Sequence, residues 1–178
     1  MKSISMGVIA LATAGLTLAA SKTAFEDLQS TTSAVKIHAD AVNTIYGTTG
    51  YDWNAEHLQA IRDETNRIGQ DLRKLQESPL TPTEERALNH AIPILQTMAA
   101  NASSAIQALN DKGRPVENNG PVFNGNFHDR MLAVEANAAQ AEKIFQSLRP
   151  YEETRGTLES RQDQKANPNA GQPQEAGR

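Results

Sequence analysis

Four histidines, His38, His57, His90 and His128, are the side chains in this sequence best suited to hold a metal. Di-metal sites in helical bundles need inward-pointing glutamates and a Glu-x-x-His step, and no Glu-x-x-His occurs here. The helical register described below places His38 and His57 at the flanks of apolar faces and His90 on an outer face. His128 falls at the start of a helix. We therefore predict no metal site.

Haem ligation is the nearest alternative, because b-type cytochrome bundles use histidine and methionine as axial ligands. Met98 and Met131 fall at core positions, and His128 lies one turn before Met131. Methionine is also a common filler of apolar cores, and the register does not point His128 inward. We interpret both methionines as core residues and predict no cofactor. His128, Met131 and Met98 are kept as the candidates for cofactor binding.

Hydrolytic chemistry has no motif to support it. The sequence contains neither a G-x-S-x-G elbow nor an H-E-x-x-H step. It has no cysteine, which excludes disulfides, thiolate metal ligands and thiol nucleophiles. A glycosidase needs two facing carboxylates in a cleft, and no aspartate or glutamate occupies the regular core positions between the helix ends. We therefore predict that the protein is not an enzyme.

Tyr51 and Trp53 form a small aromatic cluster beside a short turn. Large amphipathic rings of this kind are common at protein contacts, and they also cover the ends of bundles. We keep both residues as candidates for contact with a partner, with closure of the bundle end as the alternative interpretation.

The elements that position these residues are four amphipathic segments. Apolar or small residues recur at alternating three- and four-residue steps, a pattern typical of helices packed along one face. We expect helices over about 22–46, 52–77, 82–112 and 126–149. The predicted core positions are Phe25, Leu28, Thr32, Val35, Ala39, Val42 and Tyr46; Leu58, Ile61, Thr65, Ile68, Leu72 and Leu75; Leu88, Ala91, Leu95, Met98, Ala102, Ala105 and Leu109; and Phe127, Met131, Val134, Ala138, Ala141, Phe145 and Leu148.

Local signals mark several helix ends. Thr81 and Glu84 match a capping box around Pro82 at the first helical position. Gly47 stands where a left-handed residue is expected after a helix, and Asp52 is predicted to be the N-cap of the second helix. Inside the third helix, Pro93 should produce a kink on the outward face.

Short turns at 47–51 and 78–81 predict that successive helices are antiparallel. The simplest arrangement is an all-α, up-down-up-down four-helix bundle over 22–149. Two packed helical hairpins and a more extended arrangement are the alternatives. The longer connection 113–125 is rich in Gly, Pro and Asn. It could cross the end of the bundle or form a small lid.

Both ends of the chain differ from this bundle. Residues 1–21 combine Lys2, an apolar run and small residues, which is the pattern of a cleaved secretory signal peptide. Small residues at −3 and −1 allow cleavage after Ala19 or after Ser21. The run is shorter than the roughly 20 residues needed to span a bilayer, although retention as an anchor is the alternative. Residues 150–178 lose the period and become polar, which predicts a disordered tail.

The mild net charge of −4, one unit more negative without Lys2, argues against a nucleic-acid partner. No segment after the signal is apolar enough to span a membrane, and we expect export to a bacterial-type periplasm or beyond.

The expected function is a non-enzymatic interaction or binding module of the cell envelope, with an unknown protein or envelope component as partner. The alternative is a periplasmic carrier of haem, a metal or an apolar molecule within the bundle. Alanine-rich core positions and the predicted kink motivate that alternative.

Overall fold

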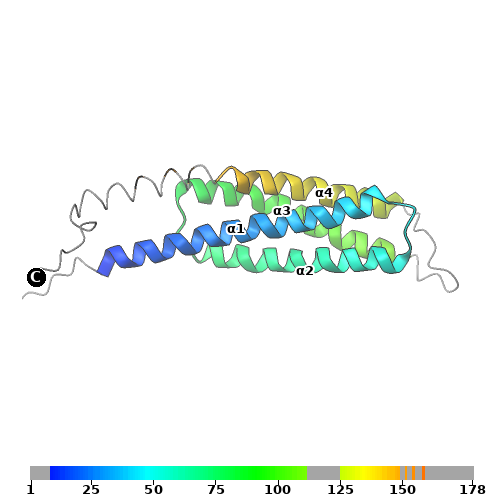
Figure 1. Ribbon diagram of the computed structural model, residues 1–178, viewed down its shortest axis with the longest axis horizontal. Coiled ribbons are helices and arrows are strands. Elements are labelled where there is room, and N and C mark those ends of the chain that lie inside the picture. Colours follow the sequence, from blue (N-terminus) through cyan, green and yellow to red (C-terminus); the bar gives the residue numbers. More distant parts are fainter. Residues whose placement is uncertain (1–8, 112–124, 149–150, 152–153, 155–157, 159–178) are drawn as a thin grey trace, which may run out of the picture.

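The chain folds as an up-down four-helix bundle, as the sequence predicts. The computed structural model describes residues 9–111 and 125–148 together with Tyr151, Thr154 and Leu158, with side chains from Thr23 onward. The helices are α1 (Ile9–Thr44), α2 (Tyr51–Gln76), α3 (Pro82–Asp111) and α4 (Gly125–Gln146). They run side by side along one long axis (Figure 1). Each helix packs on its neighbour in sequence, and α1 also packs on α4, which closes the ring.

The start of α1 differs from the prediction, which placed it near residue 22. Helical backbone already begins at Ile9, because residues 9–21 are rich in alanine and leucine, which favour the helix. Nothing is described of residues 1–8 or of the side chains up to residue 22. The signal-peptide interpretation therefore lies outside the described residues, except for this backbone. In the parts of the chain that are described, none of the helices combines the length and the apolar character required to cross a membrane.

Two further predictions concern segments that are largely undescribed. The long connection between α3 and α4 lies outside the described residues, except for its last residue, Gly125. The predicted disordered tail 150–178 also lies outside them, apart from Tyr151, Thr154 and Leu158.

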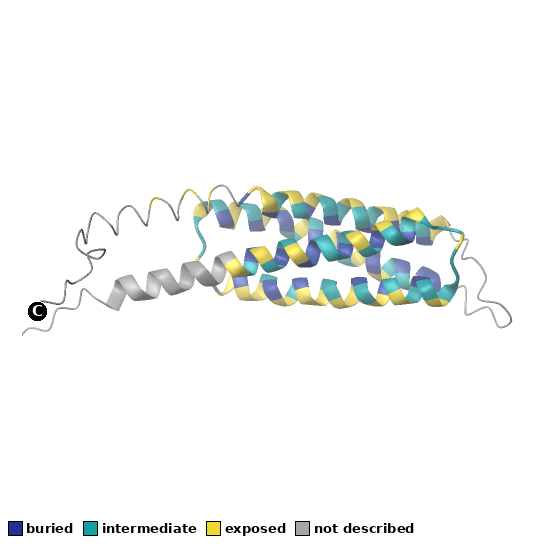
Figure 2. Cartoon of the chain, viewed as in Figure 1, coloured by how far each residue is buried: buried dark blue, intermediate teal, exposed yellow. Residues whose placement is uncertain are grey.

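The core is a continuous apolar interior to which all four helices contribute. Buried residues line the inward sides of the helices and exposed residues line the outer sides (Figure 2). Of the predicted core positions, only Tyr46, Thr65 and Leu72 are partly exposed. At the end where α1 and α4 meet near the α2–α3 turn, the rings of Phe25 and Phe145 lie 6.2 Å apart between centroids. The three- and four-residue pattern is thus confirmed as the inward face.

Several predicted end signals are confirmed. The Thr81 backbone N–H donates to Glu84 Oε2 at 2.6 Å, and the Glu84 N–H donates to Thr81 Oγ1 at 3.3 Å. This reciprocal capping box satisfies two donors at the start of α3. Gly47 has a φ of 78°, the left-handed conformation that glycine adopts without steric cost. Pro93 lies inside α3 and is exposed, as the register predicts.

The predicted N-cap of α2 is wrong. Gly50, with φ −80° and ψ 178°, occupies the N-cap, and Asp52 lies in the first turn. The Asn54 side-chain amide donates to the Gly50 carbonyl at 2.8 Å. This bond ties the first turn of α2 to the loop, and the N-cap residue makes no side-chain hydrogen bond to the N–H groups that follow it. Propensity alone favours aspartate as the cap, but the loop geometry starts the helix earlier.

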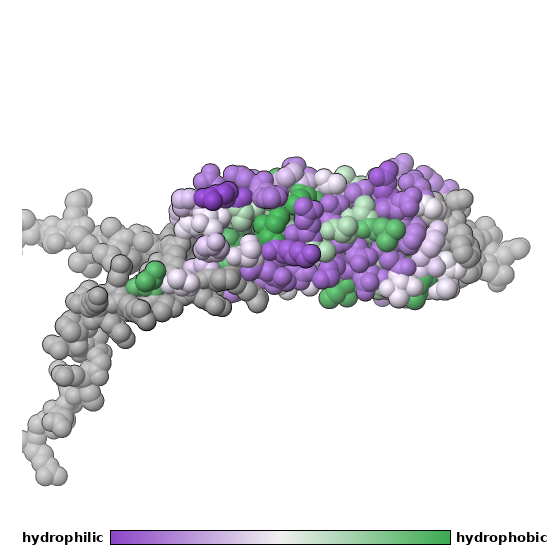
Figure 3. All heavy atoms as spheres, turned by 90° about the horizontal axis from the view of Figure 1, so that it is seen from above, coloured by the Kyte–Doolittle hydropathy of each residue, from purple (hydrophilic) through white to green (hydrophobic). Residues whose placement is uncertain are grey.

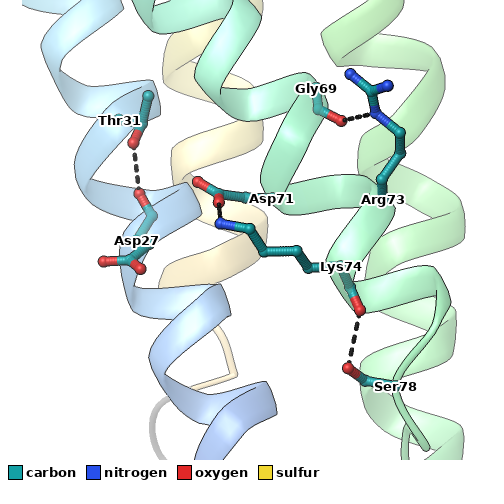
Figure 4. A network of polar contacts seen from close by, with 7 residues as sticks. All are labelled: Asp27, Thr31, Gly69, Asp71, Arg73, Lys74 and Ser78. Atoms are coloured by element: carbon teal, nitrogen blue, oxygen red, sulfur yellow. Dashed lines mark hydrogen bonds and ion pairs between the residues drawn. The ribbon is translucent and has the colours of Figure 1, made fainter.

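The prediction that no acid lies among the core positions is also wrong, because Asp71 is only 4% exposed. A straight helix advances 3.6 residues per turn, so positions 71 and 72 lie on either side of the inward direction. Packing turns Asp71 inward and leaves Leu72 at the flank. The Lys74 ammonium reaches the Asp71 carboxylate, which points from α2 toward α1 (Figure 4). Lys74 Nζ donates to Asp71 Oδ1 at 2.7 Å, whereas Oδ2 is buried without a partner.

We predict that Lys74→Met destabilises the bundle by about 1 kcal/mol, because it leaves a buried carboxylate without its cation. The expected loss is at the low end of the usual range, since the Lys74 side chain is itself 68% exposed and water can replace part of its contact. Urea unfolding followed by circular dichroism measures the change.

Arg73→Met is the matched control, because exposed Arg73 donates only to the Gly69 carbonyl of its own helix. Its free energy of unfolding should stay within about 0.5 kcal/mol of the parent protein. Equal losses in the two variants would contradict the assigned role of Lys74.

Candidate functional site at the α1–α2 end

The three candidate haem ligands lie in different environments, two in the core and one near the end of the bundle. Met98 and Met131 are completely buried in the core, which supports their interpretation as core residues. His128 is half-buried at the start of α4, and its ring stacks on Tyr46 with centroids 4.0 Å apart and planes 14° from parallel. His128 and Met131 lie three residues apart on one helix and so cannot approach opposite faces of a flat haem.

The environment of His128 differs from the solvent-facing position that the register suggested. Its Nδ1 is buried and has no hydrogen-bond partner. A buried N–H without an acceptor costs more than a buried lone pair, so this geometry favours the tautomer that carries its proton on Nε2. The His128 ring thus packs on Tyr46, just after the end of α1, and is only partly exposed to solvent.

Tyr51 and Trp53, the predicted contact residues, both pack partly against the core. The Tyr51 hydroxyl donates to Asn110 Oδ1 at 2.8 Å, which joins the start of α2 to the end of α3. The Trp53 ring lies over His57, one turn further along α2, with centroids 4.0 Å apart. Both side chains thus help to close this end of the bundle while keeping part of their surface exposed.

His38 on α1 and His57 on α2 form a pair that the sequence analysis did not find. Their Nδ1 atoms lie 3.0 Å apart, and their rings meet edge-on with centroids 5.2 Å apart. Two imidazole nitrogens at hydrogen-bond distance need one proton between them, since one must donate and the other accept. A signal was present, because His38 lies as far before Gly47 as His57 lies after Thr48. Residues at equal distances from a tight turn face each other in an antiparallel hairpin.

The electrostatics at His57 favour its neutral imidazole. Burial lowers the pKa of His57 below its usual 6.5, and the neighbouring charge of His38 lowers it further, against a smaller opposing effect of Glu56. His57 is therefore neutral at pH 7, which suits a shared hydrogen bond. We call His38 and His57 the histidine pair; Trp53 packs beside it.

On its other side, α1 makes polar bridges to α4. Lys36 Nζ lies 2.8 Å from Glu142 Oε2, and Asn43 Nδ2 donates to Glu135 Oε2 at 2.7 Å. The hydrogen bond to Glu142, followed by the charge of that carboxylate, raises the pKa of Lys36. These bridges and the histidine pair fix α1 against both of its neighbours.

The opposite end of the bundle contains a cavity of about 300 Å³. None of the residues predicted for a site lines it, and its walls combine apolar side chains with amides and a single carboxylate. The lining residues are Gln76, Ser78, Leu80, Glu85, Leu88, Asn89 and Ile92. Within the described part of the chain, no group of three or more histidine, aspartate or glutamate side chains is arranged around a common point for a metal.

No protein-family model, no curated protein and no solved structure matches this chain.

We predict that His57 makes stability depend on pH. Its folded-state pKa lies below the usual 6.5, so the unfolded chain binds the proton first as pH falls. The stability contributed by neutral His57 is present above pH 6.5 and decreases below it. Replacing His57 with Gln should flatten the decrease between about pH 7 and about pH 5, measured by urea unfolding.

His90→Gln provides the control, since His90 is exposed on α3. It should keep the pH dependence of the parent protein. If H57Q and H90Q follow the same curve, the effect does not arise at the histidine pair.

Proposed function

We propose that the chain is an exported, non-enzymatic helical bundle that acts through its outer surface, as an interaction or binding module of the cell envelope. One observation carries this proposal. The interior is filled by apolar side chains from all four helices, with Met98 and Met131 completely buried among them. Apart from the cavity near the α2–α3 turn, this packing leaves the outer surface as the part of the molecule available to a partner.

The outer surface fits this role. The face seen in Figure 3 is mainly hydrophilic, with small and separate hydrophobic areas. Interfaces that form reversibly resemble ordinary protein surface in their overall polarity, with a few aromatic or apolar residues at their centre. A partner with both polar and apolar groups matches such a surface better than a purely apolar ligand does.

We place the contact at the α1–α2 end, where Tyr51 and Trp53 keep part of their surface exposed. Internal contacts hold each ring in one orientation, through Asn110 for Tyr51 and through His57 for Trp53. A ring that is already ordered loses little entropy on binding, which favours it as an anchor. The partner would be a protein or another component of the envelope.

A carrier of haem, a metal or an apolar molecule inside the bundle is the second candidate. The observation that favours it is the buried, unpartnered Nδ1 of His128, because an orphaned buried nitrogen is a potential ligand atom. The stacking of His128 on Tyr46 and the burial of both methionines weigh against an arrangement with paired axial ligands.

A photo-crosslinking residue tests the proposed contact. Glu56 is exposed on α2 one turn after Tyr51 and Trp53, and Gln70 is exposed almost four turns further along the same face. In intact cells, the probe at position 56 should give a discrete cross-linked product and the probe at position 70 should give little. Products of equal yield at both positions, or at position 70 alone, would place the contact elsewhere.

Export is tested by the mass of the mature protein purified from a secreting host. We expect loss of the first 19 or 21 residues, so that the chain begins at Ala20 or Lys22. A chain that keeps Met1 would contradict a cleaved signal. Native mass spectrometry of the same sample also reports any small ligand retained in the bundle, which would favour the carrier.

A further inference from the structure

The two facing Nδ1 atoms of His38 and His57 have the separation of adjacent ligand atoms on one metal ion. Imidazole nitrogens bind such ions at roughly 2.0–2.1 Å. Two bonds of that length to nitrogens 3.0 Å apart enclose an angle of roughly 90 to 97°. A tetrahedral site would need a separation of about 3.4 Å. The observed separation is therefore that of neighbouring corners in square-planar or octahedral coordination.

We propose that His38 and His57 form a binding site for one divalent transition-metal ion, with Cu²⁺ or Ni²⁺ as the preferred class. Imidazole nitrogen suits both ions, and coordination near 90° is typical of their square-planar and tetragonal sites. This inference goes beyond the envelope-contact proposal and does not depend on it. It departs from the prediction of no metal site, which was made because the sequence lacks the Glu-x-x-His step of a di-metal centre, a step that a site with two histidine ligands does not need.

The hairpin holds the two ligands in place before any ion binds. His38 precedes Ala39, which is completely buried, and His57 precedes Leu58, which is 2% exposed. The backbone at each ligand is therefore anchored in the core. The Trp53 ring packs on His57, which further limits the rotation of that imidazole. A site with pre-positioned ligands binds more tightly, because less side-chain entropy is lost.

One proton changes position when an ion binds to the hydrogen-bonded pair. Before binding, one imidazole carries its proton on Nδ1, and this N–H donates a hydrogen bond to Nδ1 of the other ring. On binding, that imidazole moves its proton to Nε2 through solvent, so that both Nδ1 lone pairs face the ion. Two water ligands leave the ion as the two nitrogens bind. Because both rings are partly exposed, water can occupy the remaining coordination positions, and the nearby Glu56 carboxylate offsets part of the positive charge.

The tryptophan beside the pair makes the proposal directly measurable. Trp53 is the single tryptophan of the chain, and its ring lies 4.0 Å from that of His57. The experiment titrates CuCl₂, NiCl₂ and ZnCl₂ into the folded chain and records tryptophan fluorescence. Cu²⁺ should quench it with saturation at one ion per chain, and EDTA should restore it. A saturating ion should also raise the thermal midpoint by roughly 5 to 10 °C at a hundredfold excess over Kd.

His38→Gln and His57→Gln should each weaken Cu²⁺ binding at least tenfold, whereas His90→Gln should leave it unchanged. Circular dichroism confirms that each variant is folded. Should one of the two variants fail to fold, the other decides, and electron paramagnetic resonance of the parent complex supplies an independent count of bound nitrogens. Parent-like affinity in H38Q or H57Q would overturn the proposal, as would a Cu²⁺ signal without two nitrogen ligands or saturating Cu²⁺ that leaves the fluorescence unchanged.

Discussion

The structure depends on the burial of one apolar stripe from each helix against the stripes of the others. Aromatic residues make up only 4% of the chain, so this interior is built mainly from aliphatic side chains and alanine, together with three buried phenylalanines, Phe25, Phe127 and Phe145. Alanine contributes little buried area but allows helix axes to approach closely, and the larger side chains then fill the remaining space. Removal of apolar surface from water is the main stabilising contribution to such a core. Most of the polar contacts between helices therefore lie at the edge of this interior, and Asp71 is one of the few charged side chains buried in it.

Helix α1 makes polar contacts along both edges of its apolar face. It contacts both α2 and α4, with the histidine pair on one side and the Lys36 and Asn43 bridges on the other. Partly exposed bridges of this kind add little stability, but their geometry selects one alignment along the helix axes. The apolar stripes permit neighbouring alignments, because aliphatic contacts are not directional. The polar bridges therefore add to the apolar fit in selecting the register that brings the histidines together, and both proposals about this end of the bundle rest on that register.

Much of the fold could be predicted because helical periodicity and end signals are local. The Thr81–Glu84 capping box, the left-handed Gly47 and the burial of Met98 and Met131 follow from short stretches of sequence. The errors arise where a second element decides. Asp71 lies inward because packing against α1 settles an ambiguity of less than one residue in the α2 register. Asp52 loses the N-cap to Gly50 because the conformation of the loop, with Asn54 bonded back to it, starts the helix earlier.

The candidate site was predictable only in part. Features that depend on nearby residues in the sequence could be predicted, whereas contacts between helices could not. The sequence by itself determined the helices, their inward faces and the position of His38 and His57 at flanks, since each depends on neighbours within about one turn. Only the tertiary structure decided that these two flanks meet at 3.0 Å, that Trp53 covers one ring and that His128 stacks on Tyr46. Those contacts join residues on different helices or four residues apart within a packed end, and they depend on interhelical register. Register results from the simultaneous fit of all four helices, which no local pattern contains.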